Sequence, residues 1–163
     1  MEHRIAVAVD GSPASIAALI WALAYVQSSS GALLAVHVAD RSALWAEEAA
    51  YAYAGASTAD MERLTAAWHA HQRAVAHLVE EIAREHHCSV VFQTVTALPG
   101  EGGPAAAFLR VARWWGAELL VTGRRRHPSW IDRVLGSFSR WLVAHADLPV
   151  VLVPSPATAR EAW

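Results

Sequence analysis

Residues 119–139 read LLVTGRRRHPSWIDRVLGSFS, and the rest of the chain can be interpreted around this stretch. It begins as a short apolar run typical of a buried strand and breaks at Gly123, before three consecutive arginines. An amphipathic segment that predicts a helix begins at Gly136 and Ser137. Backbone N–H groups converge where a strand ends in glycine and the chain resumes at a helix start, and such groups bind anions. The stretch therefore predicts an anion-binding loop.

The composition predicts one domain without a preference for anionic macromolecules. The 163 residues are 55% hydrophobic, enough for a single full core, and the formal net charge is -2. Residues 1–123 hold seven arginines and twelve acids (-5), whereas residues 124–163 hold six arginines and three acids (+3). Positive charge therefore gathers locally, and we expect neither nucleic acid nor a membrane as a partner.

Several chemistries are excluded or disfavoured by residue type. The chain has no lysine, so a P-loop lysine and a Schiff-base lysine are excluded. The single cysteine, Cys88, cannot form an internal disulfide and is expected to be buried and inert. No secretory segment opens the chain, and no apolar run approaches the ~20 residues that span a bilayer. We expect a cytoplasmic protein.

Apolar runs alternate with amphipathic segments along the chain, which predicts a parallel sheet with helices on both faces. Ligands of such sheets bind beyond the carboxyl ends of the strands, where the strand order reverses. Residues 40–59 show no clear period and are expected to form a long connection, a candidate lid or partner surface. Strands are predicted at residues 4–9, 32–39, 89–98, 119–122 and 150–153, and helices at 13–30, 60–87, 104–115 and 136–145.

The first and fourth strands carry the candidate site if they are neighbours in the sheet. The loops after Val9 and Thr122 would then face each other at the point where the strand order reverses. Asp10 and the arginine-rich loop would meet there.

Six segments of the chain form a recognisable series in order and spacing: RIAVAVDGS at 4–12, VHV at 36–38, GPA at 103–105, GAELLVTG at 116–123, GSFS at 136–139 and ADLPVVLV at 146–153. Together they resemble the universal stress protein family. The resemblance implies a three-layer, Rossmann-like fold related to the adenine nucleotide alpha hydrolases, with a five-stranded parallel sheet in the order 3-2-1-4-5. It also implies one domain over residues 1–154, a tail over residues 155–163, and a homodimer formed through the fifth strand, Val150 to Val153.

One branch of this family binds ATP through Gly, two residues, Gly, nine residues, then Gly and Ser or Thr. This chain has Gly123, then Arg126 in place of the second glycine, then Gly136 and Ser137 at the matching spacing. The β-carbon of Arg126 would hinder close approach of the backbone to phosphate, whereas its guanidinium suits phosphate oxygens. Two functions follow: a regulatory protein that binds ATP or another adenine nucleotide, with or without Mg²⁺, or a nucleotide-free dimeric interaction module.

The resemblance also implies which residues bind the nucleotide. Plainer interpretations stay open, because Asp10 can close an Asx-turn and Ser137 and Ser139 can cap the last helix. The implied residues are Ala8, Val9, Asp10 and Val38 at the adenine and ribose end, Thr122, Gly123, Arg125 and Arg126 in the ribose and phosphate loop, and Gly136, Ser137, Phe138 and Ser139 at a helix N-terminus.

Catalysis and metal binding receive little support. No Ser-His-Asp or Cys-His signature is present, so we expect no enzyme, or at most very slow ATP hydrolysis. The nine histidines lack metal-ligand spacing, and His37 is expected to be a packed, hydrogen-bonded residue of the sheet. Most of the eight tryptophans should lie in the core, with Trp114, Trp141 and Trp163 as candidates for an oligomer surface.

Overall fold

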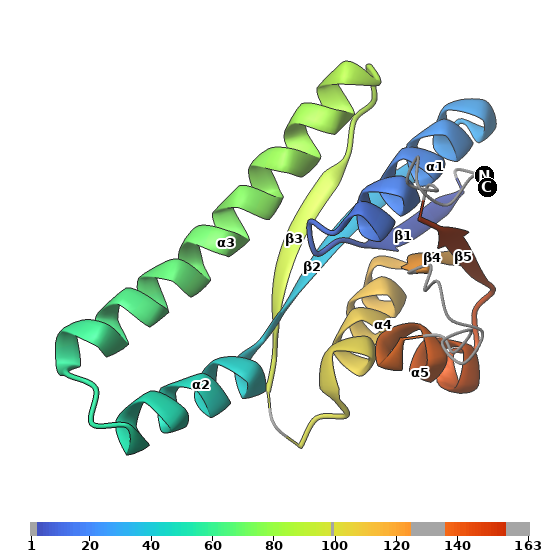
Figure 1. Cartoon of the computed structure of the whole chain (residues 1–163). Coiled ribbons are helices and arrows are strands. Elements are labelled where there is room, and N and C mark those ends of the chain that lie inside the picture. The colour runs from blue at the N-terminus through green and yellow to red at the C-terminus, as the bar shows by residue number, and fades with distance from the viewer. Residues whose placement is uncertain (1–2, 99, 125–135, 156–163) are drawn as a thin grey trace, which may run out of the picture.

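Parallel strands and helices alternate along the chain in a computed structural model that describes residues 3–98, 100–124 and 136–155 (Figure 1). The sheet has the order β3-β2-β1-β4-β5, which confirms the predicted fold. The elements are β1 (Arg4–Ala8), α1 (Pro13–Ser29), β2 (Ala32–Asp40), α2 (Arg41–Tyr53), α3 (Thr58–Glu85), β3 (Val91–Ala97), α4 (Gly103–Trp115), β4 (Leu119–Arg124), α5 (Ser137–His145) and β5 (Val150–Pro154).

Local capping residues define where the helices begin. The Ser12 hydroxyl accepts a hydrogen bond from the Ser15 N–H, and Pro13 occupies the first turn of α1. Ser57 and Asp60 form a reciprocal capping box at the start of α3. These caps satisfy N–H groups that have no partner within the helix.

The expectation of a long connection over residues 40–59 is wrong, because most of this segment is the helix α2. Its sequence is rich in alanine, which favours a helix without any help from packing. Asp40 caps the helix by accepting the Ser42 N–H. Of the side chains described in α2, only Leu44 is buried, and a helix that buries so little has no apolar period to detect. The helix and the start of α3 extend away from the sheet in Figure 1.

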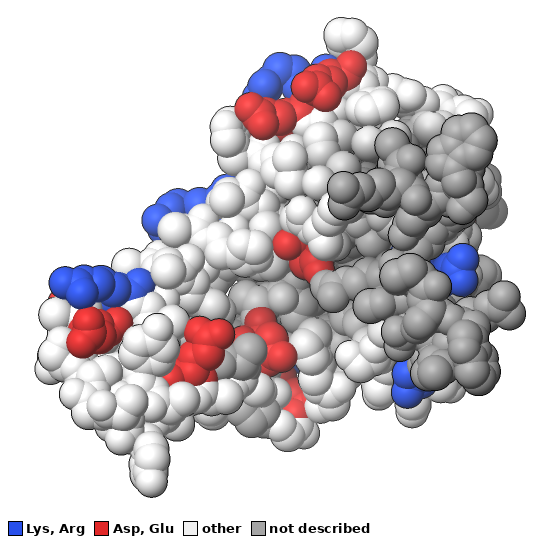
Figure 2. Space-filling model, viewed as in Figure 1, with Lys and Arg blue, Asp and Glu red and all other residues white. Residues whose placement is uncertain are grey.

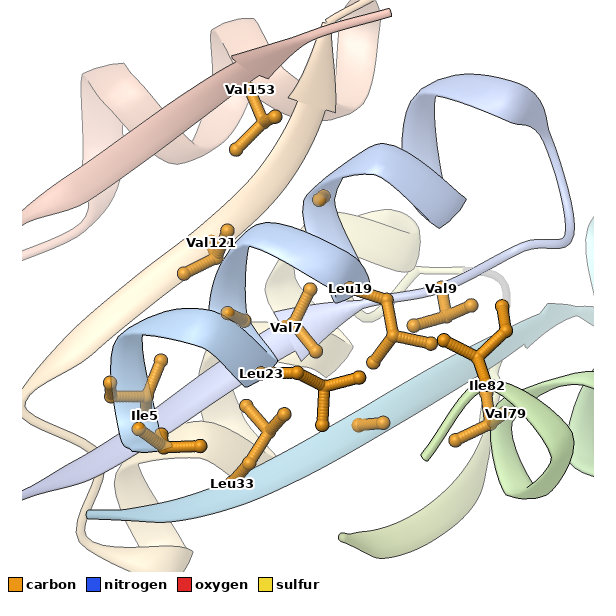
Figure 3. Packing of buried hydrophobic residues seen from close by; sticks show 14 of the residues in the cluster. Ile5, Val7, Val9, Leu19, Leu23, Leu33, Val79, Ile82, Val121 and Val153 are labelled. Atoms are coloured by element: carbon orange, nitrogen blue, oxygen red, sulfur yellow. The ribbon is translucent and has the colours of Figure 1, made fainter. Parts of the chain in front are cut away.

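Helices cover the two faces of the sheet and form one apolar core on each. On the first face, Leu19 and Leu23 of α1 lie against Val7 of β1, and Val79 and Ile82 of α3 complete the cluster (Figure 3). On the second face, Phe108 of α4 and Leu142 of α5 are fully buried against β2 and β4. The strands are therefore apolar on both sides, as parallel strands usually are.

The tryptophan prediction is wrong within the described residues, where neither buried core contains an indole. Trp21, Trp115 and Trp141 are half-buried at the edges of the cores, and Trp114 is 81% exposed. Alanine, valine and leucine fill the space between helices and sheet instead. Cys88 is also only partly buried, rather than fully buried as expected.

The sheet topology places β1 at the point where the strand order reverses. β1 pairs with β2 on one side, with Ala8 opposite Val36, and with β4 on the other, with Val7 opposite Val121. The chain therefore leaves the carboxyl ends of β1 and β4 side by side. No helix within the described residues is both long enough and apolar enough to cross a membrane.

Candidate functional site

A cavity of about 330 Å³ lies at the carboxyl ends of β1, β2 and β4. This volume is at the lower end of the range typical of small-molecule sites, ~300 to 1,000 Å³. Two predicted residues, Arg125 and Arg126, lie outside the described residues. The other ten all line the cavity: Ala8, Val9, Asp10, Val38, Thr122, Gly123, Gly136, Ser137, Phe138 and Ser139.

Five further residues line the cavity and were missed by the sequence reasoning. Ser12, Ala14 and Ser15 belong to the cap and first turn of α1, within or next to the helix predicted at 13–30. Val36 lies two positions before Val38 in β2, so the period of a strand places it on the same face. Pro104 begins α4 beyond the end of β3, and no local sequence signal relates it to β1.

The N-terminus of α5 faces the cavity. Gly136 is the N-cap residue, and among the residues that the structure describes no side-chain cap hydrogen bond is present there. The capping interpretation of Ser137 and Ser139 is therefore wrong, since the Ser139 hydroxyl instead donates to the Gly123 carbonyl at 3.3 Å. The first N–H groups of a helix have no intrahelical partner, and they carry the positive end of the helix dipole. This end of the cavity suits an anion.

Asp10 closes an Asx-turn and also lines the cavity. Its Oδ1 accepts the Ser12 N–H at 2.9 Å, which confirms the turn interpretation. The Asp10 N–H donates to the Ser15 hydroxyl at 3.2 Å, and that hydroxyl donates in turn to the Ser12 carbonyl at 3.0 Å. These hydrogen bonds fix the turn after β1 to the first turn of α1. The Asp10 side chain is exposed and lines the cavity.

Gly123 has a packing role that its sequence context did not indicate. A β-carbon at this position would lie 2.3 Å from the Ala14 carbonyl oxygen and 2.8 Å from the Ser15 nitrogen. The backbone of β4 therefore approaches the start of α1 more closely than any side chain permits. Gly136 differs, because an added β-carbon there would meet no atom of the described residues within 4 Å.

The cavity combines an apolar wall with a polar end. Ala8, Val36 and Val38 from the sheet, with Pro104 and Phe138, provide the apolar surface. The Phe138 ring is held by the buried Phe108, with ring centroids 5.7 Å apart. Hydroxyls of the α1 start, β4 and the α5 start supply the polar end. Such a site accommodates a ligand with a flat apolar part and an anionic part.

His37 lies in β2 behind the cavity and is buried, as predicted. Its Nδ1 lies 2.9 Å from the Val9 carbonyl oxygen, and its ring meets the His71 ring edge-on at 5.6 Å. Burial lowers the pKa of His37 below its ordinary value of 6.5; His71 lowers it further, whereas the Val9 hydrogen bond and Asp10 oppose the shift. The imidazole is therefore neutral at neutral pH.

Positive charge is scattered over the described residues on the face shown in Figure 2. The arginine side chains there are separated from one another and do not form one continuous basic surface. Within residues 3–98, 100–124 and 136–155, no group of three His, Cys, Asp or Glu side chains is arranged to hold a metal ion.

Solved structures share this fold over nearly the whole chain. A member of the universal stress protein family from Burkholderia pseudomallei is 25% identical, with a TM-score of 0.66, covering 93% of this chain and 95% of its own. One from Arabidopsis thaliana with AMP bound is 20% identical, with a TM-score of 0.65 and coverages of 99% and 95%. A universal stress protein in complex with cAMP is 16% identical, with a TM-score of 0.62 and coverages of 95% and 98%.

No curated protein gives a significant match to the sequence. The family model described as the universal stress protein family, in contrast, matches residues 1–154, which is most of the chain. With the strand order and the site geometry, this match shows that the chain belongs to the universal stress protein family.

Proposed function

We propose that this chain is a regulatory protein that binds an adenine nucleotide, with ATP among its ligands, in the cavity between β1 and β4. The observation that carries the proposal is the N-terminus of α5, which has no side-chain cap among the described residues and lies in one cavity with an apolar wall. AMP and cAMP occupy two universal stress proteins of the same fold, which supports an adenine nucleotide as the ligand class.

The two ends of the cavity suggest how the nucleotide lies. The base would rest on Val38, Pro104 and Phe138, because flat apolar rings gain most from burial against aliphatic and aromatic carbon. The phosphate would meet the N–H groups of Ser137 and Phe138, where the helix dipole favours negative charge. The roles of Arg125 and Arg126 stay predictions from the sequence alone.

Isothermal titration calorimetry tests the proposal directly. The purified chain is titrated with AMP and with ATP, each with and without Mg²⁺, and saturable binding at one site per chain is expected. The Mg²⁺ arms report whether the metal contributes to ATP binding. Absence of heat up to millimolar nucleotide would refute nucleotide binding and favour the nucleotide-free alternative.

We also propose a homodimer formed through β5, which is an edge strand of the sheet. Val150, Val151 and Leu152 are only partly buried, and an apolar edge strand is usually paired or covered. The chain is expected to have a dimer mass by light scattering. Leu152→Lys should yield folded monomers. The fold should tolerate the change because Leu152 belongs to neither core cluster, and the dimer should be lost because a lysine on an edge strand opposes pairing with another strand. A monomeric wild type contradicts this proposal.

A further inference from the structure

The peptide group between Val9 and Asp10 is held from both sides. Its carbonyl accepts a hydrogen bond from His37 in β2, and its N–H donates to the Ser15 hydroxyl at the start of α1. The Val9 N–H donates to the Val36 carbonyl at 2.9 Å. The backbone that carries Asp10 into the cavity is therefore fixed by three hydrogen bonds to two elements, β2 and α1, although β1 itself ends at Ala8.

The hydrogen bond to Val9 determines which nitrogen of His37 carries the proton. A carbonyl oxygen only accepts, so Nδ1 must be the donor. His37 is 4% exposed, and its burial favours the neutral ring, which leaves Nε2 without a proton. The titratable groups near the ring are His71 from α3 and Asp10 from the turn after β1. A buried neutral ring with a fixed tautomer is a rigid donor.

We propose that His37 is a positioning residue of the nucleotide site, which orients the Val9–Asp10 peptide through its Nδ1–H and thereby places Asp10 in the cavity. The inference rests on the proposed nucleotide function. His37 itself does not line the cavity, and it acts through Val9. Loss of the donor would leave the Val9 carbonyl buried without its partner, and the turn would rotate to find another.

Two substitutions separate the hydrogen bond from the bulk of the ring. Asparagine places an amide N–H near the position of Nδ1, whereas leucine fills similar space without a donor. Affinity for AMP is measured by calorimetry near neutral pH. His37→Leu is expected to weaken AMP binding roughly tenfold, and His37→Asn is expected to restore it to within about twofold of the wild type.

A matched control separates positioning from general loss of stability. Val79→Ala opens a cavity in the core on the same face of the sheet, and Val79 does not line the site cavity. It should lower the melting temperature without changing AMP affinity. If Val79→Ala weakens AMP binding as much as His37→Leu does, the loss of affinity in His37→Leu reflects lower protein stability. The positioning role of His37 is then refuted.

Amide hydrogen exchange provides a readout that does not depend on the nucleotide. In the free protein, His37→Leu should accelerate exchange of the Asp10 N–H, and His37→Asn should not. Unchanged exchange in His37→Leu refutes the positioning role even if nucleotide binds. A further outcome is that the wild type binds no AMP while His37→Leu still accelerates exchange of the Asp10 N–H. That result supports the positioning role of His37 and rejects only the nucleotide function.

The neutral ring is tested by the pH dependence of unfolding. Because the pKa of His37 is lowered in the folded state, the unfolded chain takes up the proton first as the pH falls through 6.5. The wild type should therefore lose stability on acidification more steeply than His37→Asn, which has no ring to protonate. Equal slopes would show that the ring is not held neutral in the folded state, and would overturn the assignment of a neutral ring with an unprotonated Nε2.

Discussion

Gly123→Ala is expected to lower the free energy of unfolding by roughly 3 kcal/mol, with reduced yield of folded protein. The new β-carbon would lie 2.3 Å from the oxygen and 2.4 Å from the carbon of the Ala14 carbonyl, and neither belongs to a side chain that can rotate away. Helix α1 would have to move off β4, and it packs on β1 and β4 through the core on that face. Urea unfolding followed by circular dichroism measures the loss.

Gly136→Ala is the matched control, because the same chemical change there adds a β-carbon that contacts none of the described residues. Gly136 has φ near -53°, which alanine adopts without strain. The loss of stability should stay below about 1 kcal/mol, the difference expected between glycine and alanine as an N-cap residue. Equal losses for the two substitutions would contradict the close approach of β4 to α1.

The fold could be predicted from the sequence because local signals agree with one another. Uniformly apolar runs at β1 and β4, caps at Ser12 and glycines at helix ends all favour the same alternating architecture. The predicted strands and helices end within two residues of the observed ones. The exception is α2, because a helix that buries little has no apolar period, and only its alanine content indicates it.

The sequence predicted those residues of the candidate site that lie at the end of a strand or at the start of a helix. Asp10, Gly123 and Gly136 follow strands or precede a helix, so their residue types are visible as breaks in the pattern. Contacts between distant segments are not visible in this way. Neither the close approach of Gly123 to the Ala14 carbonyl nor the hydrogen bond between His37 and Val9 follows from any spacing along the chain.

Ser137→Asp is expected to weaken AMP binding roughly 100-fold while leaving the protein as stable as before, or slightly more stable. A carboxylate about 5 Å from a phosphate costs about 3 kcal/mol at the effective dielectric of a protein surface. The same charge in the first turn of α5 is favourable for the helix, by ~0.3 to 1 kcal/mol, because it meets the positive end of the dipole. Calorimetry with AMP and urea unfolding measure the two effects, which have opposite signs.

Two controls make this test specific for phosphate at α5. Ser137→Asn has nearly the shape of the aspartate without its charge, and it should retain AMP affinity to within about threefold. Adenosine has no phosphate, so its affinity should be the same for Ser137→Asp and Ser137→Asn. Equal losses for AMP and adenosine would place the phosphate elsewhere and indicate that position 137 meets the nucleoside. A loss confined to AMP that diminishes at high salt is the signature of charge repulsion, because salt screens exposed charges at this distance.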